Sequence, residues 1–219
     1  RFTDTLNDKS QKGLECCEEG EGDKLLDQAQ HVVEADYYAP YLAHATMEPL
    51  NCTVAVEGDS CAVYLGTQSV QASAGAAVYY GDFDANKVKV HPAFLGGGFG
   101  RKSKPDYVVE AVAISKAINA PAQVVWSRED DIKHGYYHTV SAQYMKASLD
   151  ATGNVTGWLH RFAMPSIVST FSPGVDYAAG FEISSAANIP YDIQNMKVEV
   201  GQAPAHVRIG WLRSVINIP

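Results

Sequence analysis

The chain has 219 residues, of which 46% are hydrophobic and 19% are charged, a composition typical of globular domains with one large or two small cores. Its formal net charge is −8 and its lysines and arginines are scattered, which argues against a nucleic-acid-binding surface. No run of about 18 apolar residues occurs, so no membrane-spanning helix is predicted. The four cysteines form no C-x-x-C pair, which argues against a zinc ribbon.

The first part of the chain differs in texture from the rest. Residues 1–30 are polar, acidic and without clear periodicity, and we expect a linker or a poorly ordered arm there. Alternating apolar and polar residues predict an extended segment over 31–45. Two β-rich runs around a Gly-Asp turn predict a hairpin over 52–66. Cys52 and Cys61 are interpreted as two small buried or half-buried residues, and the alternative is that they face one another across the hairpin.

The remaining predicted elements follow in mixed order. They are a helix over 69–81 with Ser69 as its N-cap, a strand in 84–94, a helix over 105–120, a short buried strand in 121–126, a hairpin over 141–164, a long loop over 165–190 with a short helix, and a strand over 196–202. Because these elements do not repeat as βαβ units, the expected fold class is α+β, with mixed sheets, hairpins and few helices.

The stretch "LGGGFGRK" lies between a predicted strand and a predicted helix, where backbone N–H groups can bind an anion. The nucleotide-binding motifs fail here. A G-x-G-x-x-G fingerprint started at Gly98 needs glycine where Ser103 stands, and a Walker A loop started at Gly96 needs glycine where Arg101 stands. Glycine clusters are more often turns than ligand cradles, but the large apolar ring of Phe99 suits the wall of a pocket better than a flexible turn.

Other chemistries have little support in the sequence. Neither a G-x-S-x-G elbow nor an H-E-x-x-H motif occurs. His134 and His138 are four residues apart, but the glycine and aromatic residues between them argue against a helix, and no metal pair is predicted. The charged run "SREDD", residues 127–131, is interpreted as a solvated turn. No catalytic residue and no metal ligand is assigned.

Five segments together point to one family. "HATMEPLNCTVAV", "YLGTQ", "GGGFGRK", "VVWSREDD" and "WLRSV" occur in the order and rough spacing found in large molybdenum subunits of the xanthine dehydrogenase and aldehyde oxidase family. The resemblance covers about residues 31–216 and is closest to isoquinoline 1-oxidoreductase β-subunits, a branch that includes molybdopterin-dependent aldehyde dehydrogenases. It implies that residues 31–219 are a partial molybdopterin-binding domain, one lobe of a larger subunit.

The resemblance also implies an activity and its partners. The reaction would be hydroxylation of an aldehyde or an N-heteroaromatic carbon with water as the oxygen source, by molybdenum held on molybdopterin in a dinucleotide form. The implied partners are the remainder of the large subunit, the small-molecule substrate and an iron–sulfur subunit. This last partner is expected because the chain has no cluster-binding cysteine pattern.

The matching motifs imply site residues. Gly98, Phe99 and Gly100 match a turn whose backbone N–H groups lie against the apical side of the molybdenum centre. Gln68 matches a glutamine whose amide donates to an oxygen ligand of the metal. The alternative for Gln68 is a polar residue that caps the following helix. Arg213 matches an arginine near the substrate or cofactor pocket, whereas by itself it would be interpreted as a surface arginine.

The chain departs from the family pattern in two ways. Ser103 stands where the xanthine-oxidising branch has an acidic residue, so purine hydroxylation is not expected. The family's general-base glutamate matches no position here, because neither Glu48 nor Glu182 lies in the matching motif. We therefore expect the chain to be inactive without the rest of the subunit. The alternative function is an excised or free-standing domain that binds no molybdenum and acts as an assembly module.

Overall fold

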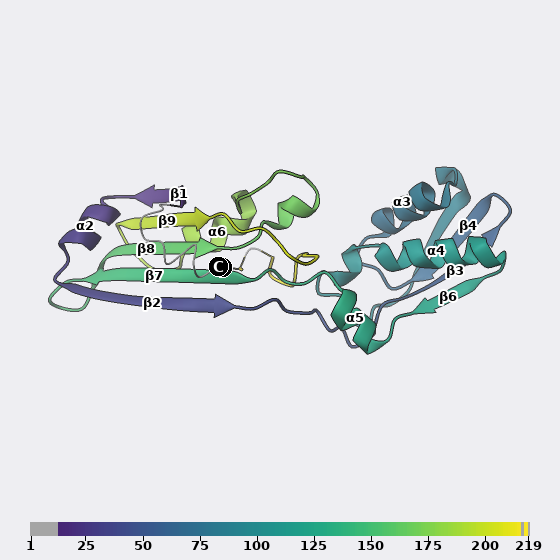
Figure 1. Ribbon diagram of the computed structural model, residues 1–219, viewed down its shortest axis with the longest axis horizontal. Helices are drawn as coiled ribbons and strands as arrows, with labels where there is room; N and C mark the ends of the chain where they lie inside the picture. Colours follow the sequence, from purple (N-terminus) through teal and green to yellow (C-terminus); the bar gives the residue numbers. More distant parts are fainter. Residues whose placement is uncertain (1–12, 216, 219) are drawn as a thin grey trace. The chain divides into compact units, whose positions relative to one another are not determined.

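The computed structural model describes residues 13–215, 217 and 218. The chain divides into two compact units, one formed by the chain up to Leu42 and from Tyr137 onward, the other by Ala43–Tyr136. We call them the five-stranded unit and the four-stranded unit after their sheets (Figure 1). The sequence had suggested one partial domain beyond residue 30. In the structure this part of the chain contributes to two units, because the residues of the four-stranded unit interrupt those of the five-stranded unit along the sequence.

The four-stranded unit has a mixed sheet in the order β5-β4-β3-β6. β3 and β4 form the predicted hairpin, while β4 and β5 are parallel and are joined through α3. Its elements are β3 (Asn51–Glu57), β4 (Ser60–Leu65), α3 (Val70–Gly81), η1 (Ala85–Lys87), β5 (Val88–Pro92), η2 (Arg101–Ser103), α4 (Asp106–Ile118), β6 (Ala122–Val125) and α5 (Arg128–His134).

Helices α3 and α4 lie side by side on one face of this sheet (Figure 1). Alternate strand residues point toward them, so that Val54 and Val63 are fully buried with Val108 and Val112 of α4. Ser69 caps α3 as predicted, because its side chain accepts a hydrogen bond from the backbone of the first turn. Both β4 and α3 contribute residues to this buried layer. The candidate site begins in the short connection between these two elements.

The five-stranded unit has a sheet in the order β1-β9-β8-β7-β2, in which β8 and β9 are parallel and the other neighbours antiparallel. Phe162, Val198 and Val200 on one face pack with Ile167 from the following loop. The predicted hairpin of β7 and β8 and the α+β fold class are confirmed. The elements are β1 (Leu14–Glu19), α2 (Gly22–Gln28), β2 (His31–Ala39), β7 (Ser141–Leu149), β8 (Val155–Ala163), η3 (Ile167–Thr170), η4 (Gly180–Ile183), α6 (Ser184–Ala187) and β9 (Met196–Gly201).

The structure differs from the expected linker over residues 14–28. β1 pairs with β9 along the edge of the sheet, and α2 packs Leu26 in a buried cluster with Tyr144 and Leu159. Residues 1–12, the rest of the predicted arm, lie outside the described residues. Polar composition hid these elements because an edge strand and a short helix need only a few apolar contacts.

Cys52 and Cys61 are both buried, as predicted. The alternative was wrong, because Cys61 lies opposite Val56 in the hairpin register and so does not face Cys52, and both thiols are free. Burial raises the pKa of the Cys52 thiol to about 12, which makes it unreactive. β6 lies at the sheet edge with Val125 exposed, although a buried strand was expected.

A buried tyrosine ties α4 to the end of β4. Tyr107 is fully buried, and its hydroxyl donates to the carbonyl of Gly66 at 3.0 Å. Tyr107→Phe leaves that buried carbonyl without its donor, so the free energy of unfolding is expected to fall by about 1 kcal/mol. Urea denaturation followed by circular dichroism measures this. Tyr79→Phe, at an exposed position of α3, is the control, and an equal loss in both variants would contradict the prediction.

Candidate functional site

The glycine loop, residues 96–102, connects β5 to α4 through η2. Gly97, Phe99 and Gly100 have φ values of 97°, 51° and 105°, all in the left-handed region. Glycine adopts this region freely, whereas Phe99 does so at a cost in backbone energy. The turn is closed by the N–H of Arg101, which donates to the carbonyl of Gly98 at 2.9 Å. The loop is therefore a defined turn held in an unusual conformation.

Gln68 is held against this loop from the end of β4. Its side-chain Oε1 accepts the N–H of Gly100 at 2.8 Å, and its backbone N–H donates to the carbonyl of Lys102 at 3.1 Å. A Cβ at Gly98 would lie closer than 3.0 Å to Oε1, so a larger residue there would displace the Gln68 side chain from its present position. The structure thus brings Gln68 together with the predicted glycines. The capping alternative is wrong, because Ser69 caps α3.

The donors on the loop are distributed differently from the expectation. The N–H of Gly100 is bonded to Gln68, so it is not available to a ligand. The N–H groups of Gly98 and Phe99 have no hydrogen-bond partner among the described residues, and neither has Nε2 of Gln68. Ser103 is also engaged, because its hydroxyl donates to the carbonyl of Gly100 at 2.6 Å. These three neutral donors on or beside one turn therefore have no hydrogen-bond partner within the part of the chain that the structure describes.

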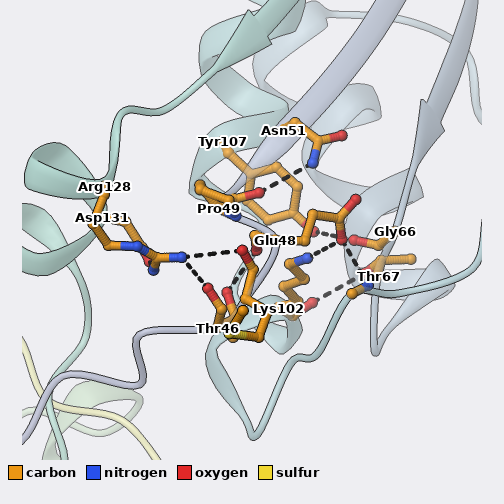
Figure 2. A network of polar contacts seen from close by, with 12 residues as sticks. Thr46, Glu48, Pro49, Asn51, Gly66, Thr67, Lys102, Tyr107, Arg128 and Asp131 are labelled. Atoms are coloured by element: carbon orange, nitrogen blue, oxygen red, sulfur yellow. Dashed lines mark hydrogen bonds and ion pairs between the residues drawn. The ribbon is translucent and has the colours of Figure 1, made fainter.

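Glu48, from the segment before β3, joins the two ends of the glycine loop, and Figure 2 shows its contact with Lys102. Its Oε2 accepts the N–H of Gly96 at 2.9 Å and also pairs with Nζ of Lys102, whose side chain is only 1% exposed. Burial by itself would raise the pKa of Glu48. The hydrogen bonds from Lys102, Gly96 and Asn51, together with the lysine charge, outweigh it and hold that pKa below its usual value.

The same segment is held from another side by α5 (Figure 2). Arg128 donates to the carbonyls of Thr46 and Met47, the latter at 3.2 Å, and pairs with Asp131 at 2.7 Å. Asp131 is buried, and Ser127 caps the helix. The interpretation of "SREDD" as a solvated turn was therefore wrong. The signal in the sequence was the serine followed three residues later by an aspartate, a typical helix start.

A second buried cation fixes the far end of the loop. Arg101 is 1% exposed and makes a two-pronged pair with Asp106, with both N–O distances at 2.8 Å. Its guanidinium lies 5.4 Å from the ring centroid of Trp126 and 5.3 Å from that of Tyr136. The sequence did not predict this pair, because Arg101 lies in the loop and Asp106 in the following helix.

The other candidate residues lie in the five-stranded unit. Arg213 is exposed and lies two residues after Trp211, whose ring stacks on that of Phe171 with the ring centroids 5.3 Å apart. Glu182 is fully buried, and its carboxylate accepts the hydroxyl of Ser166 at 2.7 Å and the N–H of Ile167 at 2.5 Å. These contacts give Glu182 a structural role in holding the loop after β8.

Metal-binding and membrane features were sought over the same residues. Between residues 13 and 215 and at 217 and 218, no group of three or more histidines, cysteines, aspartates or glutamates is arranged to hold a metal ion. No helix in that part of the chain combines the length and apolar character needed to cross a bilayer. His134 is the last residue of α5, although no helix was predicted there.

Comparison with known proteins places this arrangement in a family. Residues 6–205 match the family model of the molybdopterin cofactor-binding domain. The chain belongs to this family. It is 26% identical over 178 residues to the isoquinoline 1-oxidoreductase β-subunit of Brevundimonas diminuta, and 25% identical over 211 residues to a nicotinate dehydrogenase subunit of Pseudomonas putida. These matches take in 78% and 92% of this chain but only 22% and 18% of the two relatives.

Solved structures of this kind share the fold. The chain matches quinoline 2-oxidoreductase from Pseudomonas putida 86 with a TM-score of 0.73 and 15% identity, over 94% of this chain and 27% of that one. It matches the aldehyde oxidoreductase from Desulfovibrio gigas with a TM-score of 0.69 and 14% identity, over 94% and 22%. The predicted membership of the xanthine dehydrogenase and aldehyde oxidase family is confirmed. Four of its five motifs lie in the four-stranded unit, and "WLRSV" lies in the other.

Acid is expected to weaken the network at Glu48. Because its folded-state pKa lies below the usual 4.5, its contribution to stability is present above that value and is lost as the pH falls through the folded-state pKa. The free energy of unfolding, measured in urea from about pH 7 to about pH 3, should therefore fall further in the wild type than in Glu48→Gln, which has no carboxyl to titrate. Identical pH dependence in the two proteins would contradict the assignment.

Proposed function

We propose that this chain is part of the large subunit of a molybdopterin-dependent oxidoreductase that hydroxylates an aldehyde or an N-heteroaromatic carbon with oxygen from water. Gln68, Gly98, Phe99 and Gly100 form one wall of the cofactor pocket in this proposal. Membership of the molybdopterin cofactor-binding family supports the cofactor. The names of the relatives, isoquinoline 1-oxidoreductase and nicotinate dehydrogenase, support an N-heteroaromatic substrate.

The observation that carries the proposal is the set of unused donors beside the glycine loop. Because Oε1 of Gln68 is bonded to Gly100, the amide orientation is fixed and Nε2 is the free end. The N–H groups of Gly98 and Phe99 are free as well, with respect to the residues that the structure describes. Neutral donors held by a fixed backbone suit the oxygen atoms of a cofactor, because they bind oxygen without adding charge. The residues present therefore fit the group.

When bound, molybdopterin supplies the redox chemistry, and the protein supplies binding, orientation and exclusion of water. Gln68 and the N–H groups of Gly98 and Phe99 would hold the cofactor through hydrogen bonds. The exposed ring of Phe99 would give the pocket an apolar wall. Gly100 acts through Gln68, since its N–H sets the direction of the amide.

Groups outside the glycine loop, in this chain and in the rest of the assembly, would carry out the rest of the reaction. Arg213 would orient a polar group of the substrate or an anion, because a guanidinium binds such groups with two parallel hydrogen bonds. The remainder of the large subunit would supply the general base. Glu48 and Glu182 are both committed to hydrogen bonds within the protein. An iron–sulfur subunit would accept the electrons.

Molybdenum analysis tests the proposed function. The large subunit that contains this chain, purified with its iron–sulfur partner from a host that makes the cofactor, should hold about one molybdenum and one pterin per subunit. Elemental analysis and pterin fluorescence measure both. A metal-free subunit from such a host would overturn the proposal in favour of a non-catalytic assembly module.

Substitution of Gln68 tests the wall of the pocket. Gln68→Ala removes the amide donor and the acceptor of the Gly100 N–H, and it should lower molybdenum content or substrate-dependent dye reduction by about 10–100-fold. Gln71→Ala, three residues further on at an exposed position of α3, is the matched control and should behave as the wild type. Equal activity in the two variants would remove Gln68 from the site.

A further inference from the structure

One carboxylate oxygen serves both ends of the glycine loop. Oε2 of Glu48 accepts the N–H of Gly96, the first residue of the loop, at 2.9 Å. It also pairs with Nζ of Lys102, the last residue. The backbone of Glu48 adds a third tie, because its N–H donates to the carbonyl of Gly96 at 3.0 Å. The distance between the loop's ends is thus set by one side chain from a different segment.

The contacts continue from Lys102 to Gln68. The carbonyl of Lys102 accepts the N–H of Gln68 and the hydroxyl of Thr67, both at 3.1 Å. Oε1 of Gln68 then accepts the N–H of Gly100, which lies within the same loop. Hydrogen bonds, together with the covalent bonds within Lys102 and Gln68, therefore connect Glu48 to the side-chain amide of Gln68. The last hydrogen bond returns to the glycine loop at Gly100.

Electrostatics explains why this path depends on the ion pair. The ammonium group of Lys102 is almost fully removed from water, so it needs a negative partner and Glu48 provides it. The neighbouring cation, Arg101, is already matched by Asp106. Without Glu48 the lysine would have to leave its position, and its carbonyl would move with it. The left-handed backbone at Phe99 and Gly100 would then lose the contacts that hold it.

We infer that Glu48 and Lys102 are a positioning pair, which sets the course of the glycine loop and thereby the direction in which Gln68 presents its amide N–H groups. That these amide groups face a cofactor rests on the proposed function. The positioning of the loop and of the Gln68 amide by the pair is independent of it and can be measured on the chain without any cofactor.

Amide hydrogen exchange on the ¹⁵N-labelled 219-residue chain tests the pair. Lys102→Met removes the charge and keeps most of the side-chain length. It should make the amides of Gln68, Gly96 and Gly100 exchange about tenfold faster or more, because each is bonded within the path. The side-chain NH₂ signals of Gln68 should move toward those of a glutamine side chain without fixed hydrogen bonds. The buried strand amides of Val54 and Val63 should keep their wild-type rates.

Three further variants separate positioning from general stability. Glu48→Gln is milder, because it keeps the shape, and should give the same pattern if Lys102→Met does not fold. Lys102→Arg keeps the charge and should restore much of the protection. Lys87→Met removes an exposed ion pair with Asp59 in the same unit and should leave the loop unchanged.

The outcomes are distinct. A rise confined to the loop amides, with recovery in Lys102→Arg, would establish the positioning pair. An equal rise at Val54 and Val63, or the same rise in Lys87→Met, would reduce the pair to an ordinary contribution to stability and overturn the inference. Absence of molybdenum from the intact subunit would overturn the proposed function and leave these exchange rates as they are, so the two failures can be told apart.

Discussion

The burial of the Lys102 ammonium group is the constraint on which the candidate site depends. A lysine that is 1% exposed requires an anion within contact distance, and Glu48 can reach it only if the segment before β3 lies against the glycine loop. That approach places the N–H of Gly96 on the same carboxylate. One electrostatic requirement thus joins two segments that lie far apart in the chain and fixes the turn between β5 and α4.

Irregular backbone elsewhere in the molecule is held in the same way, by charged side chains that take the place of a sheet or helix. Arg128 binds two carbonyls of the segment before β3, and Glu182 binds the backbone after β8. Backbone groups in such segments have no neighbouring strand to bond to, and buried ones must find another partner. The charged residues in these positions are therefore part of the architecture, and only the donors that remain unused are available to a ligand.

The regular elements could be predicted from the sequence because their signals are local. Alternation predicted the hairpin of β3 and β4, and Ser69 predicted the start of α3. The elements that were missed have weak local signals: β1 is a polar edge strand, and α5 begins in a charged run whose Asp131 turns inward. The four predicted residues at the glycine loop do lie together. The choice between helix cap and loop contact for Gln68 could not be made in advance, because Gly100 lies 32 residues further on.

The contacts that orient Gln68 all come from the four-stranded unit. Glu48, Lys102 and Gly100 belong to it, and so do the cations of Arg101 and Arg128 that hold its loops. The direction of the amide is consequently set by protein contacts before any ligand arrives. The conformational entropy of the loop and of the Gln68 side chain is therefore lost on folding and not on ligand binding. In the proposed function, a cofactor would meet donors that are already in place, so little free energy would be lost in ordering them on binding. Glycine at position 98 suits this arrangement, because an added Cβ would push the amide of Gln68 away from the loop that orients it.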